Sequence, residues 1–254
     1  MARGLTTLNR RRELAIQNAL VDRLAAGFER SLSKQLNATM IKAVRQFNKD
    51  GSDIGINSIV MQDVPRLEKL FASQYRAVMI EFGNRILSGL KSHKPTAHKD
   101  VNDDFMVRVN DFIRVYALDR ATSISGTTID QLRSIIQEGS VEGLGTREIA
   151  RNITERIPTI ANYRSNTIAR TETHSASGYA SEMAATETGL NLKKEWVAFI
   201  DGREREAHAE ADGQVVNRDE DFTVDGEQLA YAGDPSGSAG NIINCRCTVL
   251  YFEE

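Results

Sequence analysis

The sequence has few of the residues that fasten a chain covalently or anchor it in a membrane. Only two of its 254 residues are cysteine, which is too few for the disulfide framework of a small secreted protein. No apolar run approaches the roughly 18 residues that a membrane-spanning helix needs. The charge is nearly balanced, with 32 Lys and Arg against 35 Asp and Glu. This balance excludes an overall basic field that would recruit nucleic acid or an anionic membrane, so any such contact must be local.

The N-terminus also lacks the apolar core of a secretory signal peptide. The first residues, Met1-Ala2-Arg3-Gly4, lead directly into charged sequence. Together with the scarcity of cysteine, this predicts a protein that is made and folds in a reducing cytoplasm and has no membrane partner.

Helical periodicity dominates the first 190 residues. Between Leu20 and Val44 apolar residues recur every four positions, so the stripe winds around a helix of about residues 8–48, which then needs partners on several sides. A second helix is predicted after Pro65 to about residue 92. Further helices are predicted at 103–124, 129–136, 146–158 and 160–187, separated by breaks at 125–128, at 139–145 and at Pro158.

The pattern changes after Gly189. Residues 196–200 are typical of a strand, the region to Gly240 is rich in Asp and Gly, and residues 243–251 indicate a closing β run. The segment from 202 to 239 is predicted to be one long loop. The sequence therefore predicts the α+β class: an extended, mostly helical N-terminal region followed by a small β-rich C-terminal module.

A candidate metal site joins the two ends of this module. Cys245 and Cys247 are two positions apart, so in a strand their thiols would lie side by side on one face. His208 could add an imidazole, with Asp201 or Asp212 as a fourth ligand, and thiolate with imidazole suits zinc. The alternative is that both cysteines are ordinary small core residues and that His208 caps or bridges a loop.

Two other polar groups have a structural and a functional interpretation. Arg170 and His174 share a helix face, as do Thr171 and Ser175, so this stripe either docks the helix onto the following module or hides a catalytic acid or base. The cluster of Arg10, Arg11 and Arg12 either contacts DNA phosphates or an acidic partner, or is a solvated helix end.

In order along the chain, these elements resemble the phage head morphogenesis family that includes the minor head protein F of phage Mu. The resemblance covers about residues 145–251. It is carried by Arg170 and Glu172 in Ala-Arg-Thr-Glu-Thr, by Trp196, by the run from Asp201 and Arg203 to His208, by Asp212-Gly213, by Asp234-Pro235 and by Arg246 in Asn-Cys-Arg-Cys. It implies a variable helical region at 1–143 and a head morphogenesis domain at 144–254, with helices at 146–188 and a β module at 195–254.

The resemblance implies a minor capsid protein of the virion. Such a protein would lie inside the head near the portal vertex and aid prohead assembly, DNA packaging or DNA ejection. Its partners would be the portal protein, other capsid proteins and the packaged DNA. The family supplies no catalytic residues, so we expect no enzyme and no established cofactor, although zinc at His208, Cys245, Cys247 and Asp212 stays open.

The alternative function is a metal-dependent effector enzyme delivered with the genome. In that interpretation the same four residues hold the metal and Glu172 serves as the base. A weaker third hypothesis is a DNA-binding accessory factor that acts through the N-terminal arginines, but Glu13, Asp22 and Glu29 interrupt any basic stripe on the first helix.

Overall fold

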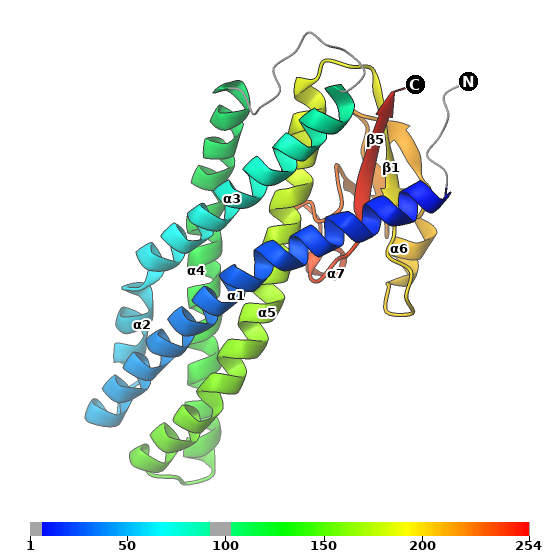
Figure 1. Cartoon of the computed structure of the whole chain (residues 1–254). Helices are drawn as coiled ribbons and strands as arrows, with labels where there is room; N and C mark the ends of the chain where they lie inside the picture. The colour runs from blue at the N-terminus through cyan, green and yellow to red at the C-terminus, as the bar shows by residue number, and fades with distance from the viewer. Residues whose placement is uncertain (1–6, 92–102, 254) are drawn as a thin grey trace. The chain divides into compact units, whose positions relative to one another are not determined.

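The computed structural model describes residues 7–91 and 103–253 of the chain. Its helices are α1 (Thr7–Asp50), α2 (Ile54–Met61), α3 (Val64–Lys91), α4 (Asp103–Val141), α5 (Thr146–Glu187), α6 (Glu206–Glu210) and α7 (Ala239–Ile242). Its strands are β1 (Leu192–Val197), β2 (Val215–Asn217), β3 (Phe222–Val224), β4 (Glu227–Leu229) and β5 (Thr248–Glu253). Long helices thus precede a small antiparallel β module, which confirms the α+β class (Figure 1).

The long helices run further than the sequence pattern predicts. The predicted break at 125–128 is wrong, because the hydroxyls of Thr127 and Thr128 donate to the carbonyls four residues earlier instead of capping a new helix. The predicted stop at Pro158 is also wrong. Proline removes one helical hydrogen bond, but Ile157 before it and Ala161 after it are completely buried, and their packing keeps α5 continuous. The predicted end of the second helix at 92–95 lies outside the described residues.

The chain divides into two compact units. The first, called here the module unit, comprises Met1–Ala26, Tyr75–Asn110 and Arg170–Glu254, and the second, the helical unit, comprises Gly27–Gln74 and Asp111–Ala169. Each is therefore built from segments that are distant in the sequence. Every feature of the candidate site lies in the module unit.

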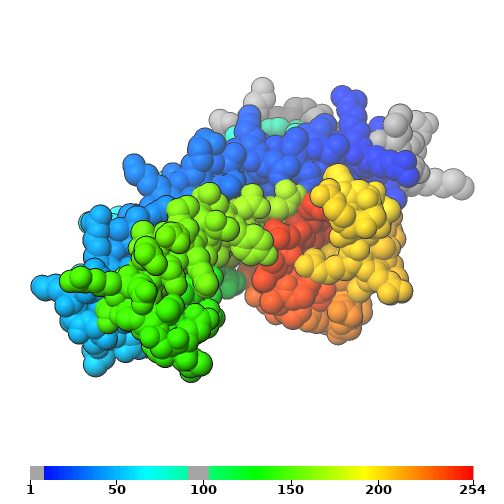
Figure 2. Space-filling model, turned by 90° about the horizontal axis from the view of Figure 1, so that it is seen from below, coloured from blue at the N-terminus to red at the C-terminus, as the bar shows by residue number. Residues whose placement is uncertain are grey.

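A three-stranded antiparallel sheet of order β2-β1-β5 organises the module unit. Alternate residues of β1 face opposite sides, as strand geometry requires. Leu192, Lys194 and Trp196 point into a core shared with the C-terminal half of α5 and the β3–β4 hairpin, whereas Val197 packs with Leu250 and with Leu14 of α1. The first turns of α1 therefore cover the other face of the sheet, and Figure 2 shows this dark blue segment directly against the yellow β1 region.

The segment predicted to be one long loop is more ordered than expected. Residues 202–239 contain the short helix α6, the strand β2 and the β3–β4 hairpin, which turns at Asp225 and Gly226 with positive φ angles of 51° and 75°. The first strand also begins at Leu192, earlier than the predicted 196, because the alternating pair Leu192 and Lys194 is buried as deeply as Trp196.

The helical unit is held by apolar packing with a few buried polar contacts. The rings of Phe28 and Phe71 meet edge to face, with centroids 5.1 Å apart. The hydroxyl of Thr39 donates to the buried carboxylate of Asp63 at 2.5 Å, and Arg66 pairs with the same carboxylate. In the part of the chain that the structure describes, no helix is both long and apolar enough to cross a lipid bilayer.

Candidate metal centre

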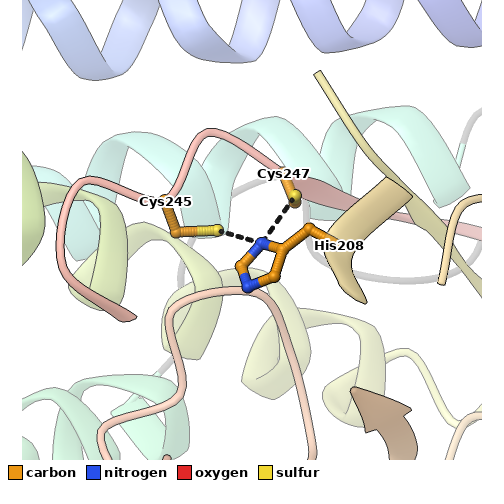
Figure 3. A group of neighbouring side chains, drawn as sticks. All are labelled: His208, Cys245 and Cys247. Atoms are coloured by element: carbon orange, nitrogen blue, oxygen red, sulfur yellow. Dashed lines mark hydrogen bonds between the residues drawn. The ribbon is translucent and has the colours of Figure 1, made fainter. Parts of the chain in front are cut away.

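Two short segments of the module unit bring His208, Cys245 and Cys247 together. His208 lies on α6, and both cysteines lie between the end of α7 and the start of β5 (Figure 3). The expectation that the cysteines lie in a strand is wrong. Asn244 has a positive φ of 55° and the amide of Cys245 bonds back to the carbonyl of Ile242, so the chain is still turning there. The two sulfurs nevertheless point toward one imidazole nitrogen.

The ligand atoms of this cluster are close together and buried. Nδ1 of His208 is 3.3 Å from Sγ of Cys247 and 3.6 Å from Sγ of Cys245, and all three atoms lie within 4.8 Å of one another. The three side chains are only 2–3% exposed. Both cysteines are free thiols.

The imidazole of His208 is oriented by a buried amide. Its Nε2 lies 3.2 Å from Oδ1 of Asn241, and Nδ2 of Asn241 donates to the carboxylate of Glu227 at 2.8 Å and to the carbonyl of Val224. Because the amide nitrogen is committed to these acceptors, its oxygen must face the imidazole. Nε2 of His208 is therefore the donor, and the lone pair of Nδ1 faces the two sulfurs.

The backbone that carries the cysteines is held from two helices. Thr171 of α5 accepts a hydrogen bond from the amide of Asn244, and Nε2 of His174 lies 2.7 Å from the carbonyl of Cys247. Asn18 of α1 donates to the carbonyl of Arg246 at 3.0 Å. Through Thr171 and His174, the polar face of α5 thus forms a seam that docks this helix onto the module.

An aromatic wall closes the cluster on one side. The indole of Trp196 meets the ring of His208 edge to face with centroids 5.8 Å apart, and it meets Phe222 in the same way at 5.4 Å. Trp196 is completely buried, and its indole nitrogen has no hydrogen-bond partner among the described residues. That N–H is near enough to Cys247 to favour a thiolate there.

The two thiols do not hold their protons equally. A hydrogen bond from Cys247 lowers the pKa of Cys245 well below its ordinary value, although burial opposes this shift. The same contact, together with burial, raises the pKa of Cys247. Burial acts to lower the pKa of His208, but the contacts with Cys245 and Asn241 outweigh it and the net shift is upward.

Neither aspartate considered as a fourth ligand joins this cluster. Oδ1 of Asp212 accepts a hydrogen bond from the amide of Ala198 at 2.8 Å and pairs with Arg10 at 3.3 Å. Asp201 forms a two-pronged ion pair with Arg246, with distances of 2.6 and 2.8 Å. Both carboxylates thus have other partners, and neither belongs to the group of converging ligand atoms. The structure thus brings together three of the four predicted metal ligands.

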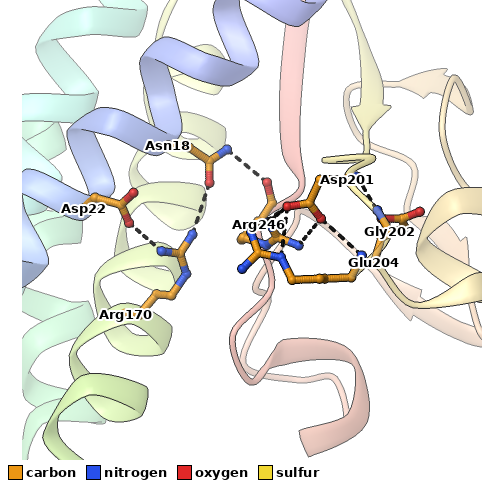
Figure 4. Close-up of polar contacts among 8 residues, drawn as sticks. Asn18, Asp22, Arg170, Asp201, Gly202, Glu204 and Arg246 are labelled. Atoms are coloured by element: carbon orange, nitrogen blue, oxygen red, sulfur yellow. Dashed lines mark hydrogen bonds and ion pairs between the residues drawn. The ribbon is translucent and has the colours of Figure 1, made fainter.

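The residues that carry the family resemblance are called here the signature residues. Most of the charged ones form one polar layer (Figure 4). Asp201 binds both Arg246 and Arg203, and these hydrogen bonds hold the pKa of its carboxyl group far below the ordinary value. The guanidinium of Arg246 also lies 4.8 Å from the ring of Phe199. On the other side of Asn18, Arg170 pairs with Asp22 of α1 at 2.5 Å.

The remaining signature residues serve the fold in other ways. Glu172 accepts a hydrogen bond from the hydroxyl of Tyr75 at 2.5 Å. Asp234 accepts hydrogen bonds from the amides of Ala230 and Ser236 and so closes the turn after β4.

The N-terminal arginines separate into two kinds. Arg10 pairs with Glu195 at 3.0 Å as well as with Asp212, so it fastens α1 to the β module. Arg11 and Arg12 are exposed. Arg12 lines a cavity of about 910 Å³ together with residues of α1, α3 and β5.

Several residues that organise the site give no signal in the sequence. Asn241 and Glu227 orient His208, but each is a common surface residue type in a loop-rich stretch. Asn18 lies on a helix more than 200 positions from the cysteines, so no local pattern connects it with them. Lys194 is 1% exposed and pairs with Glu182 at 3.4 Å, a placement that only its alternation with Leu192 and Trp196 could have indicated.

One protein family and several curated proteins are similar to part of this chain. The family described as Phage Mu protein F like protein matches residues 130–250. Among curated proteins, the chain is 41% identical over 116 residues to the NAD(+)--arginine ADP-ribosyltransferase EFV of Enterococcus faecalis, a match that covers 44% of this chain and 23% of that protein. It is 29% identical over 126 residues to the Minor head protein GP7 of Bacillus phage SPP1, covering 48% of this chain and 40% of that protein.

A third relative is an uncharacterized protein of Haemophilus influenzae, 28% identical over 130 residues, or 50% of this chain and 26% of that protein. The chain thus spans less than half the length of each of these relatives. No solved structure matches it. The signature residues described above all lie within the matched segment. Through residues 130–250, just under half of its length, the chain is similar to the family described as Phage Mu protein F like protein.

Proposed function

We propose that this protein is a minor component of a phage head, which binds the portal protein and other capsid proteins inside the head and aids prohead assembly, DNA packaging or DNA ejection. The similarity to Minor head protein GP7 over the family segment carries this proposal. The module has the features of an assembly domain, since its signature residues make contacts within the fold.

We also propose that this domain is not an enzyme. Glu172, the base of the enzyme hypothesis, is engaged by Tyr75. Cys245, Cys247 and His208 are almost fully buried, so a substrate has no access to them. The similarity to the ADP-ribosyltransferase covers 23% of that protein. The chain is also similar to a protein named for its place in the head, so we assign the matched segment to assembly and not to the transferase activity.

Exposed apolar side chains of the helical unit are the best candidates for contacts with head partners. Val115 and Leu118 lie three positions apart on one face of α4 and are 53% and 48% exposed, and Tyr163 on α5 is 75% exposed. Exposed apolar side chains grouped on one helix face often mark protein interaction sites. We therefore place the capsid or portal contact on this face of α4.

Coexpression with the portal protein of the same phage tests the proposal. The full chain should co-purify with the portal and sediment with proheads. The double variant Val115→Asp/Leu118→Asp should lose most of this association. Asp119→Ala is the matched control, because it changes a 66% exposed side chain on the same helix and should leave the association intact. Recovery of the wild-type chain no greater than that of an unrelated protein would remove the head assignment.

Contact with packaged DNA is tested separately through the exposed arginines. Arg11→Gln/Arg12→Gln removes two positive charges and keeps the Arg10 pairs that fasten α1. If these side chains neutralise phosphates, DNA binding by the wild type should weaken as salt rises, and the variant should show a smaller salt dependence by about one counterion for each lost contact. Equal salt dependence in both proteins would restrict the proposed partners to protein.

A further inference from the structure

We propose that His208, Cys245 and Cys247 bind one zinc ion, as a buried structural centre that ties α6 to the segment between α7 and β5. This inference is independent of the head assignment. It starts from three ligand atoms of the types zinc prefers, which come from two distant parts of the chain and converge within 4.8 Å.

The spacing of the ligands fits a tetrahedral ion. With Zn–S of about 2.3 Å and Zn–N of about 2.0 Å, tetrahedral angles separate the nitrogen from each sulfur by about 3.5 Å. The two observed separations, from Nδ1 of His208 to the sulfurs of Cys247 and Cys245, are 3.3 and 3.6 Å. An ion can therefore enter with small side-chain adjustments and no backbone movement.

Without an ion, the two thiols face one strong acceptor, so one S–H must turn to the neighbouring sulfur, which is only a weak acceptor. Nδ1 of His208 offers one lone pair, because Nε2 is committed to Asn241, yet the thiols of Cys245 and Cys247 both face it. Only one S–H can use that lone pair. Zinc removes the conflict: both thiols lose their protons to solvent, each sulfur forms a bond to the ion, and the Nδ1 lone pair forms the third bond.

The surroundings are those of a metal site with its outer contacts in place. Histidines that bind metal usually donate their other ring N–H to an oxygen acceptor, and Asn241 provides one that Glu227 holds in position. The indole N–H of Trp196 is a second, independent sign. It is fully buried and has no hydrogen-bond partner among the described residues.

Because its ligands are buried, the proposed zinc centre is structural and not catalytic. The cluster supplies three protein ligands, which leaves one of the four zinc positions for a small ligand such as water. Because the ligands are only 2–3% exposed, this position cannot receive a substrate. The ion would instead stabilise a small module whose strands are as short as three residues.

Metal analysis of the full chain is the first test. Protein expressed with added zinc salt and freed of loosely bound metal should carry about one zinc per chain, measured by elemental analysis and by native mass spectrometry. Cobalt substituted for zinc should give a thiolate-to-cobalt charge-transfer band in the near ultraviolet. Removing the metal under denaturing conditions and refolding without it should lower the melting temperature read from Trp196 fluorescence.

Three kinds of variant locate the ion. Cys245→Ala and Cys247→Ala should each reduce the zinc content severely and abolish or weaken the cobalt band. Asn241→Leu removes the acceptor behind His208 and should weaken zinc affinity by 10- to 100-fold while leaving the ligands in place. His93→Ala/His98→Ala replaces two of the other histidines of the sequence and should retain the full zinc content, which excludes adventitious binding by histidine.

Two outcomes would overturn the proposal. One is a wild-type chain that stays free of metal after refolding with zinc and melts at the same temperature with and without a chelator. The other is an intact mass lower by two hydrogens, which would show that Cys245 and Cys247 form a disulfide. Both measurements use the wild-type chain, so they decide the matter even where a variant fails to fold, and neither depends on portal binding.

Discussion

The contact between Gly233 and His174 gives a sharp test of how α5 is docked onto the module. Gly233 has a φ of +83°, and a Cβ added there would lie 2.4 Å from Nδ1 and 2.9 Å from Cε1 of His174. The imidazole cannot withdraw freely, because its Nε2 contacts the carbonyl of Cys247 at 2.7 Å and the residue is only 5% exposed. Gly233→Ala should therefore strain the backbone and separate α5 from the module.

The expected cost has two parts that a control separates. An L-residue with left-handed backbone angles costs about 1–2 kcal/mol. Overpacking a buried contact costs about 1–3 kcal/mol more. Gly226→Ala is the matched control, since Gly226 has a φ of +75° and nothing lies within 4 Å of an added Cβ. We expect Gly226→Ala to show only the first part and Gly233→Ala to show both.

Urea unfolding followed by tryptophan fluorescence measures this difference. Trp196 is the single tryptophan of the chain and is completely buried in the module unit, so its signal reports on the unit that contains both glycines. The free energy of unfolding of Gly233→Ala should lie about 1–3 kcal/mol below that of Gly226→Ala. Equal losses in the two variants would show that His174 does not press on Gly233, and the argument for a tightly packed seam would fail.

Two further predictions concern buried and paired charges in the same unit. Lys194→Met should lower the free energy of unfolding by about 3–5 kcal/mol, because it leaves the carboxylate of Glu182 buried without its main partner. In the same urea experiment, the double variant Lys194→Met/Glu182→Leu should lose less stability. A double variant that is less stable than the single one would contradict this. The pKa of Asp201 is depressed chiefly by Arg246, so its contribution to stability should be present above its ordinary pKa of 3.8 and lost as the pH falls below that value. Asp201→Asn should lower the melting temperature at pH 7 and flatten its fall in acid, and equal melting temperatures at pH 7 would refute the role of this pair.

The sequence predicted the large features because they repeat along the chain. Apolar residues at helical spacing located every long helix, and the change in composition after Gly189 located the β module. The polar face of α5 was also interpretable, since Thr171 and His174 are neighbours of known helix geometry. The interruption at 125–128 and the stop at Pro158 were wrong because the local signals for capping and for proline were weaker than the burial of flanking residues. These are Ile124 and Ile129 in the first case and Ile157 and Ala161 in the second.

The site was only partly predictable, because its geometry depends on contacts between distant segments. The spacing of Cys245 and Cys247 indicated that their thiols face one way, although they do so in a turn and not in a strand. The pairing of Asp212 with Arg10 could not be foreseen from either local pattern, since 202 positions separate them. The acceptor behind His208 is a single Asn241 in a loop-rich stretch, a residue type and position that carry no periodic signal.

The contacts of α1 indicate that the family segment is completed by residues outside it. Within residues 130–250, Arg170, Arg246 and Glu195 have partners in the first turns of α1, at Asp22, Asn18 and Arg10 respectively. Thr248 likewise donates to Gln17. Charges and hydrogen-bonding groups that lose such partners become costly, so the matched segment depends on a helix that precedes it in sequence. The first turns of α1 therefore close the polar layer on which the fold of the matched segment depends.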